Sequence, residues 1–344
     1  MGKLCVPVLI LLLSVGCAQD DRSSLVVYSP HGKEMLSDYE HAFEAANPDV
    51  DIQWIDMGGQ NAYDRVRTER QNPQASIWWG GDGPTFNRAA SEGLLEVYRP
   101  SWADAVAEAN RNRDDFWYGT FLTPEIILYN SRTVSEGEQP LDWDDLLKPE
   151  WEGKIIIRYP LASSTMRTIW GALIMRQPTE EDGYAWLARL DRNTKTYAAD
   201  PTQLYLKIAR EEGEVSLWNM PDTYIQSELN GYPFGFSIPL SGTPVLTDAI
   251  AIVAGGAHPD IARRFYEFVT SDSALVSQAN KYFRIPVRND LDTSLLPDWM
   301  AASKIPHMEV DWERLTTEGA RWMQHWDEFI KGRGGKYLAD RGLN

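Results

Sequence analysis

The chain of 344 residues is 43% hydrophobic and 24% charged, which is the composition of a folded protein rather than a disordered tail. Its length indicates about two domains. Lys and Arg together number 33 against 50 Asp and Glu, a net charge of −17. Because a surface of that sign repels phosphate backbones, nucleic acid is excluded as a partner.

The first 17 residues have the pattern of an export signal. Lys3 precedes an apolar run, Leu4 to Leu13, and three small or short residues follow it. A bilayer-spanning helix needs about 20 apolar residues, so this run predicts a cleaved signal. Cys17 comes next and resembles the lipidated cysteine of bacterial lipoproteins; a plain signal peptide is the alternative. Since Cys5 would be removed with the signal, we expect no disulfide and no thiolate metal site.

Strands and helices then alternate. Hydrophobic periodicity predicts strands over 25–28, 50–55 and 76–79, followed by helices over 34–46, 61–71 and 86–93. Three such units in a row indicate a parallel sheet with helices on its faces. The loops after the strands end in glycines, and ligands of such sheets bind beyond the carboxyl ends of the strands.

The later part of the chain repeats this arrangement between two long extended runs. The runs cover 118–130 and 243–253. Between them we expect an acidic helix and turn over 141–153, strands over 155–158 and 215–218, and helices over 165–176, 182–190 and 201–211. Helices over 259–270 and 312–330 follow. The pattern predicts an α/β protein of two lobes joined by paired crossovers.

Four segments together resemble a known family: LVVYSPHGKE, ERQNPQASIWWGGDGPTFNRAASEGLLEVY, DWDDLLKPEWEGKIIIRYPLASSTMRT and FRIPVRND. They are similar to bacterial extracellular solute-binding proteins of ABC importers, in the branch of the ferric-ion-binding proteins. The resemblance implies a type II periplasmic-binding-protein fold in which two lobes close on a solute, with the crossovers as hinge. The expected lobes are 25–122 with 248–285, and 123–247 with 286–344.

The resemblance also sets expectations about partners and location. It implies a monomer that binds a small-molecule solute, docks on a membrane permease driven by an ATPase, carries no cofactor and performs no catalysis. The expected location is the periplasm or the cell surface, with membrane attachment only through a lipid on Cys17.

The clearest candidate for ligand binding is a run of three hydroxyl residues, Ser163, Ser164 and Thr165, at the start of a predicted helix. The unpaired N–H groups and the positive end of a helix favour an anion there. Arg158 and Arg167 are candidates for a charge-assisted contact. An ordinary helix cap is the alternative, because Ser and Thr are preferred at that position.

Further candidates come from the loops after other strands. In the first lobe they are Ser29, His31, Gly32, Gly59, Gly81 and Asp82; in the second they are Trp218, Asn219, Asp222 and Tyr224. Aromatic faces and polar groups of this kind suit an organic body with hydroxyl groups. Of Trp78 and Trp79, at most one is expected to face the cleft, because neighbouring residues of a strand point to opposite faces. The leading ligand class is a small anionic, phosphorylated organic solute.

Two alternatives stay open. Ferric iron is the second ligand class, with His31, Asp82 and Tyr224 as possible ligands. The resemblance implies paired tyrosines in the second lobe, and only Tyr224 is present in that segment. An enzyme acting on glycosides, with Asp56 and Glu125 as carboxylates, is the other alternative. No nucleophile elbow, Walker loop or zinc-protease motif occurs in the sequence, so we expect a binding protein.

Overall fold

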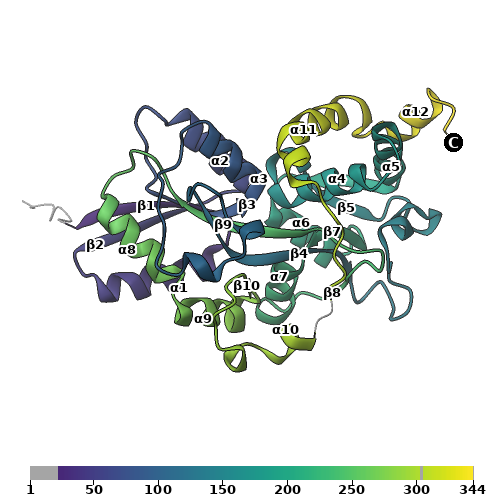
Figure 1. Cartoon of the computed structure of the whole chain (residues 1–344). Helices are drawn as coiled ribbons and strands as arrows, with labels where there is room; N and C mark the ends of the chain where they lie inside the picture. The colour runs from purple at the N-terminus through teal and green to yellow at the C-terminus, as the bar shows by residue number, and fades with distance from the viewer. Residues whose placement is uncertain (1–21, 303–304, 344) are drawn as a thin grey trace, which may run out of the picture.

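The computed structural model describes residues 22–302 and 305–343; the predicted export signal and Cys17 lie outside them. Two α/β lobes lie side by side, and a ten-stranded sheet runs through both (Figure 1). The strand order is β2-β1-β3-β9-β4-β7-β5-β6, with β8 and β10 pairing with β4. The predicted two-lobed α/β fold is confirmed.

The N-terminal lobe contains the three predicted strand–helix units. They are β1 (Ser23–Ser29), α1 (Lys33–Ala46), β2 (Val50–Asp56), α2 (Gly59–Thr68), β3 (Ile77–Asp82) and α3 (Gly83–Ser91). β1 pairs in parallel with both β2 and β3, as expected from the alternation. The later elements of this lobe are β9 (Val245–Ile252), α8 (Pro259–Val269), α9 (Asp272–Tyr282) and β10 (Ile285–Pro286).

The C-terminal lobe surrounds the parallel strands β5, β6 and β7. Its elements are β5 (Ile155–Arg158), α4 (Ser164–Met175), α5 (Glu180–Asn193), β6 (Thr194–Ala198), α6 (Pro201–Ala209), β7 (Val215–Asn219), α7 (Met220–Tyr224), β8 (Phe234–Ser237), α10 (Asp298–Ala302), α11 (Trp312–His325) and α12 (Gly334–Ala339). β5 pairs in parallel with β6 and β7. Helix α11 continues into a π-helical turn over Trp326–Ile330, within the predicted 312–330 helix.

One long strand, β4 (Tyr118–Asn130), belongs to both lobes. Its first half, up to Pro124, pairs with β9 of the N-terminal lobe, and its second half, from Glu125, pairs with β7. The Glu125 N–H also donates to the Pro244 carbonyl at 3.1 Å, at the second connection between the lobes. The two expected crossovers therefore meet at Glu125.

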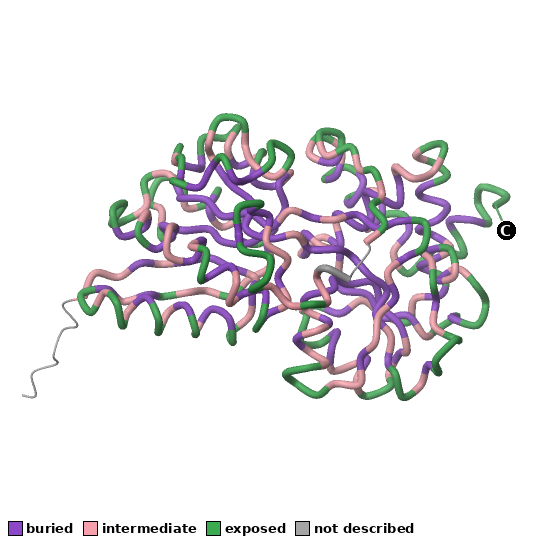
Figure 2. Tube along the Cα trace, turned by 60° about the horizontal axis from the view of Figure 1, so that its bottom comes forward, coloured by how far each residue is buried: buried purple, intermediate pink, exposed green. Residues whose placement is uncertain are grey.

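Both lobes have their own buried core, seen as the purple interior of each half in Figure 2. Trp78 and Trp79 are both fully buried, and neither lines the cleft described below. Trp78 stacks on Phe86 with ring centroids 4.1 Å apart, and Trp79 meets Tyr39 of α1 edge to face. Helices cover both faces of β3, so both indoles pack against helices.

Some element boundaries differ from the sequence-based expectation. β3 runs on to Asp82 through Gly80 and Gly81, whose φ angles of 116° and 133° shift its register against β9. Helix α2 begins at Gly59, earlier than predicted. β6, β8 and α9 were not predicted, and the expected acidic helix over 141–153 consists of two short 3-10 turns. No helix in the described residues has the length and apolar character needed to cross a bilayer.

Candidate functional site

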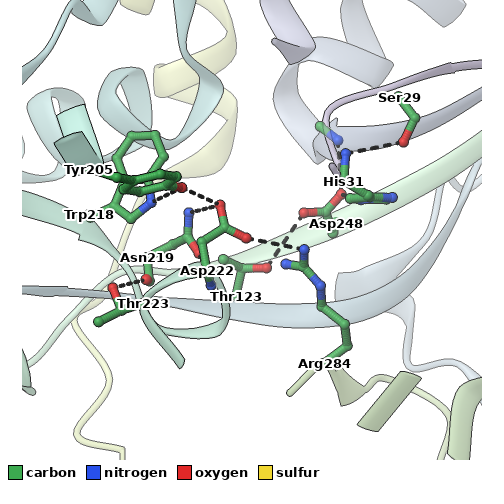
Figure 3. A network of polar contacts seen from close by, with 11 residues as sticks. Ser29, His31, Thr123, Tyr205, Trp218, Asn219, Asp222, Thr223, Asp248 and Arg284 are labelled. Carbon is green, nitrogen blue, oxygen red and sulfur yellow. Dashed lines mark hydrogen bonds and ion pairs between the residues drawn. The ribbon is translucent and has the colours of Figure 1, made fainter. Parts of the chain in front are cut away.

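A cleft with a cavity volume of about 80 Å³ lies where the two lobes meet. Both lobes and the crossover strands line it. The lining residues are Pro30, His31, Gly58, Gly59, Gly81, Thr123, Arg158, Ala162, Ser163, Ser164, Thr165, Pro201, Trp218, Asn219, Asp222, Leu246, Asp248 and Arg284. Figure 3 shows the polar network, in which Arg284 pairs with Asp222, and Asp248 contacts His31. We refer to this space as the cleft.

The start of α4 forms part of the C-terminal wall. Ser163 is the helix cap, and its side chain accepts from the Met166 N–H at 3.3 Å. Ser164 occupies the first helical position; its hydroxyl is buried, and no described residue gives it a hydrogen-bond partner. Thr165 lines the cleft next to it. The N–H groups of a first helical turn have no partners inside the helix, so this wall presents donors to a ligand.

Arg158, at the end of β5, is the most unusual group in the cleft. Its exposure is 4%, yet the described residues give it no ion pair. Nη1 donates to the Ala198 carbonyl at 3.3 Å, and Nε has no partner in the described chain. Burial lowers the pKa of this guanidinium. Asp200 acts on this charge from beyond ion-pair distance and offsets part of the effect, so Arg158 is a buried cation whose charge is only partly compensated by the described residues.

The other two buried arginines are paired with carboxylates. Arg284 Nη2 lies 3.1 Å from Asp222 Oδ1, and Arg288 Nη2 lies 2.7 Å from both Asp290 Oδ2 and Asp272 Oδ1. Arg158 stands apart from them because no carboxylate of the described residues forms an ion pair with it, and only the more distant Asp200 acts on its charge.

Asn219, Asp222 and Trp218 line the cleft from β7 and α7. Asn219 caps α7 by accepting from the Asp222 N–H at 2.9 Å, and its amide donates to Asp222 Oδ2 at 3.0 Å. Trp218 Nε1 donates to the Tyr205 hydroxyl at 3.0 Å (Figure 3). These bonds fix the orientation of the Asp222 carboxylate, and Arg284 compensates its charge.

The N-terminal wall centres on Asp248, which sequence reasoning missed. His31 Nε2 lies 3.2 Å from Asp248 Oδ1, and the Gly81 N–H donates to the same oxygen at 2.9 Å. Thr123 Oγ1 donates to Oδ2 at 3.5 Å, the outer limit of a hydrogen bond. The one sequence signal was a lone acid in the apolar run TPVLTDAIAIV. His31 Nδ1 is buried without a partner in the described chain.

Two glycines bring the walls together. A Cβ on Gly58 would lie 2.6 Å from the Ala162 carbonyl oxygen, and a Cβ on Gly59 would lie 2.6 Å from Ser164 Oγ. Ala162 and Ser164 belong to the opposite lobe. Only residues without a side chain allow this approach, so Gly58 and Gly59 permit the lobes to meet here.

Several predicted site residues lie elsewhere. Ser29 is buried and accepts from the His31 N–H at 3.3 Å, but it does not line the cleft. Gly32 is the N-cap residue of α1 and does not line the cleft. Arg167 donates from Nε and Nη2 to the Leu161 carbonyl and lines a different cavity. Of the two predicted arginines, only Arg158 lines the cleft.

Asp82 and Tyr224 also lie outside the cleft. Asp82 caps α3 by accepting from the Thr85 N–H at 2.7 Å, as Asp does before a helix with Pro in its first turn. Tyr224 stacks on Phe283 with centroids 4.8 Å apart. His31, Asp82 and Tyr224 therefore do not line one cavity, and the described residues contain no cluster of three or more His, Cys, Asp or Glu that could hold a metal.

Glu125 lies in the hinge with 0% exposure, and both carboxyl oxygens lack a partner among the described residues. Burial raises its pKa well above the usual range, and the charges of Asp222, Asp248 and Asp82 raise it further. Asp56, the other carboxylate of the glycosidase alternative, is exposed at the end of β2. Neither residue lines the cleft.

The sequence has recognisable relatives. The family described as bacterial extracellular solute-binding protein matches residues 75–316. A probable ABC transporter periplasmic-binding protein, y4fP of Sinorhizobium fredii, is 24% identical over 315 residues, covering 88% of this chain and 85% of the relative.

Solved structures share the fold. The periplasmic binding protein P5PA superposes with a TM-score of 0.80 at 24% identity, covering 90% of this chain and 100% of P5PA. AfuA from Actinobacillus pleuropneumoniae, with exogenous fructose-6-phosphate bound, gives 0.79 at 22% identity, with coverage of 90% and 98%. The ferric binding protein from Campylobacter jejuni gives 0.74 at 18% identity, with coverage of 88% and 98%.

Proposed function

The chain belongs to the bacterial extracellular solute-binding proteins, and from this premise we propose that it delivers a small phosphorylated organic solute to an ABC importer. The solute binds in the cleft between the lobes and leaves unaltered, so the protein is not an enzyme.

The observation that carries the proposal is the unpaired charge of Arg158. A buried cation without an ion pair costs several kcal/mol; the more distant Asp200 offsets part of this cost, and a ligand anion removes the rest. A phosphoryl group offers two oxygens to one guanidinium in a bidentate contact. The same group accepts from the Ser164 hydroxyl and from the N–H groups at the start of α4, which line the same wall.

The rest of the cleft suits an organic body. Asp222 and Asp248 present carboxylate oxygens, which accept from hydroxyl or ammonium groups but repel a second phosphate. The Trp218 indole supplies an apolar face. AfuA, which has the same fold, holds fructose-6-phosphate, a solute of this class. Ferric iron ranks lower because Tyr224 packs on Phe283 rather than in the cleft.

Capture follows from the position of the contacts. Because the cleft is lined by both lobes, a solute contacts all of its partners only when the lobes are closed, and binding favours that state. The hinge is the crossover at Glu125, where β4 changes partners. The closed protein docks on a membrane permease whose ATPase drives import, and a lipid on Cys17 keeps the protein near it.

Calorimetric titration with matched solutes tests the proposal. Sugar phosphates and phosphonates are compared with their unphosphorylated counterparts, and with ferric citrate. We expect at least one phosphorylated compound to bind about 100-fold more tightly than its counterpart, and Arg158→Gln to remove most of that difference. Arg132→Gln, an exposed arginine, is the matched control. Tighter binding of unphosphorylated sugars or of ferric ion would contradict the proposal.

A further inference from the structure

A second, smaller cavity of about 30 Å³ lies between the lobes, outside the cleft. Helices α2 and α3 of the N-terminal lobe line it on one side, and α4 and α11 of the C-terminal lobe line it on the other. Figure 1 shows these helices next to one another above the sheet. We call it the latch cavity; the residues that matter are Gln60, Asp82, Arg88, Arg167 and Thr168.

Two arginines from opposite lobes line the latch cavity, and neither has an ion pair in the described chain. Arg88 Nη2 donates to Gln60 Oε1 at 3.1 Å, and its guanidinium lies over the Tyr63 ring, 4.0 Å from the centroid. Its Nε is buried without a partner among the described residues. Arg167 uses Nε and Nη2 on one carbonyl, that of Leu161, at 3.2 and 2.8 Å.

The charges of the latch cavity do not balance. Two guanidinium groups face one carboxylate, Asp82, whose Oδ1 already accepts from the Thr85 N–H. Burial lowers the pKa of Arg167, and the charge of Arg88 adds to this effect; Asp82, and Asp64 from outside the cavity lining, partly offset it. The two like charges therefore lie close enough to destabilise each other when the lobes are together.

A fully buried hydroxyl completes the site. Thr168 has 0% exposure, and its Oγ1 has no hydrogen-bond partner in the described residues. Thr168 and Arg167 come from neighbouring positions on α4. With Arg88 Nε and the remaining N–H groups of Arg167, the cavity offers donors from both lobes.

The size of the latch cavity limits its occupant. A volume of about 30 Å³ is room for about two water molecules, so a sugar or a phosphate ester is too large. Water satisfies the donors but leaves the excess positive charge. An anion of chloride size satisfies both.

We propose that the latch cavity binds a small inorganic anion of chloride size, held by Arg88 from one lobe and Arg167 from the other. The complete donor set exists only when the lobes are together, so the anion stabilises the closed state. By linkage, it raises the affinity for any solute that needs closure, and the solute raises the affinity for the anion. This inference does not require the solute to be phosphorylated.

Thermal unfolding of the mature chain without solute, in sodium chloride and in sodium gluconate at equal ionic strength of about 100 mM, tests it. We expect a melting temperature about 2 °C higher in chloride. Arg88→Gln and Arg167→Gln should each lose this difference, and Arg70→Gln, at an exposed arginine in the turn after α2, should keep it. In Arg158→Gln, the part of the difference that depends on Arg88 and Arg167 should remain, because Arg158 lines the cleft and not this cavity. If Arg158→Gln loses the difference and the other variants keep it, the anion binds in the cleft and the inference is wrong.

A crystallographic measurement on the unaltered chain is independent of how the variants fold. Crystals grown in sodium bromide should show an anomalous peak between Arg88 and Arg167. A peak only beside Arg158, or no peak between the lobes, would contradict a latch site. The first of these two results would leave the proposed solute-binding function intact.

Discussion

The two walls of the cleft differ in how their charges are compensated. On the N-terminal wall, Asp248 accepts from the Gly81 N–H and contacts His31 within its own lobe. On the C-terminal wall, Arg158 and Ser164 have polar atoms for which the described chain supplies no partner. The N-terminal wall compensates its acid but leaves His31 Nδ1 without a partner in the described residues, whereas the C-terminal wall leaves a cation without an ion pair. We therefore propose that the C-terminal wall recognises the anion and that the N-terminal wall completes the cleft by closing on it.

This difference predicts two kinds of mutational effect. Changes on the C-terminal wall should alter selectivity between phosphorylated and unphosphorylated solutes. Changes on the N-terminal wall that prevent closure should weaken all solutes by a similar factor, because closure is required whatever the solute carries.

The largest effect is expected for Gly58→Val. Apart from its chain neighbours, only Ala162 of the other lobe has atoms within 4 Å of a Cβ at this position among the described residues, so the side chain obstructs closure without clashing inside its own lobe. We expect a loss of about 100-fold in affinity for every solute that binds, measured by calorimetry. Gly335→Val is the matched control, because no atom lies within 4 Å of its Cβ. Unchanged affinity in Gly58→Val would show that the lobes need not meet there.

Glu125→Gln tests the carboxyl beneath the meeting point of the walls. Burial raises the pKa of Glu125 in the folded chain. Below a pH of about 4.5 this carboxyl is protonated in both the folded and the unfolded chain, so it does not lower the free energy of unfolding. As the pH rises further, the unfolded chain ionises while the folded chain keeps its proton, and the free energy of unfolding falls. Glutamine does not titrate, so the variant should gain about 1.4 kcal/mol over wild type per pH unit across this window.

Urea unfolding at several pH values between 4 and 8 measures this difference. Glu150→Gln, at an exposed glutamate, should show no such trend. Parallel pH profiles for Glu125→Gln and wild type would mean that Glu125 is ionised in the folded chain. In that case the hinge would carry a third negative charge next to Asp222 and Asp248, which disfavours an anionic solute.

The double variant Ser164→Ala with Thr165→Ala addresses the C-terminal wall alone. Removing hydroxyls that donate to an anion should cost about 1–2 kcal/mol, or about tenfold in affinity for a phosphorylated solute. Affinity for unphosphorylated solutes should change little. If the affinities for phosphorylated and unphosphorylated solutes fall equally, these hydroxyls support the helix rather than recognise the anion. The proposed difference between the two walls would then be wrong.

The smallest effect is expected away from both walls, at Arg321. This residue joins α11 to α5 through Glu180, with two N···O distances of 2.7 Å, and lowers the pKa of Glu180 to about 2. The stabilisation exists above the usual pKa of a glutamate and is lost as the pH falls toward 2. Arg321 is 55% exposed, so Arg321→Gln should cost only about 0.5 kcal/mol at pH 7, in urea unfolding. A larger loss, or a loss that persists at pH 2, would contradict this assignment.

Local patterns in the sequence were enough for most of the strand–helix units and for the position of one wall. Ser163 caps α4, and Ser164 and Thr165 begin it, at the predicted start of a helix, because a cap and the helix it starts are neighbours in sequence. Asp248 and Arg284 were missed for the opposite reason. The run 243–253 was predicted as a crossover between the lobes, but no local pattern indicates that Asp248 of this run, or Arg284 further on, faces the cleft.

Two other differences come from residues that serve a local role. Because glycine has a low helix propensity, the predicted start of α2 was after Gly59. In the structure Gly59 lies in the first turn of α2, where it packs against Ser164. Asp82 and Tyr224 had plausible ligand chemistry. In the structure, Asp82 caps a helix and Tyr224 stacks on another aromatic ring. Neither role requires a ligand.

Native mass spectrometry of the protein released from cells that export it tests the central claim most directly. The account predicts a bound small molecule whose mass and fragments contain a phosphoryl group, present on wild type and lost from Arg158→Gln. An uncharged sugar or a ferric ion bound instead, or the same adduct on both proteins, would contradict it.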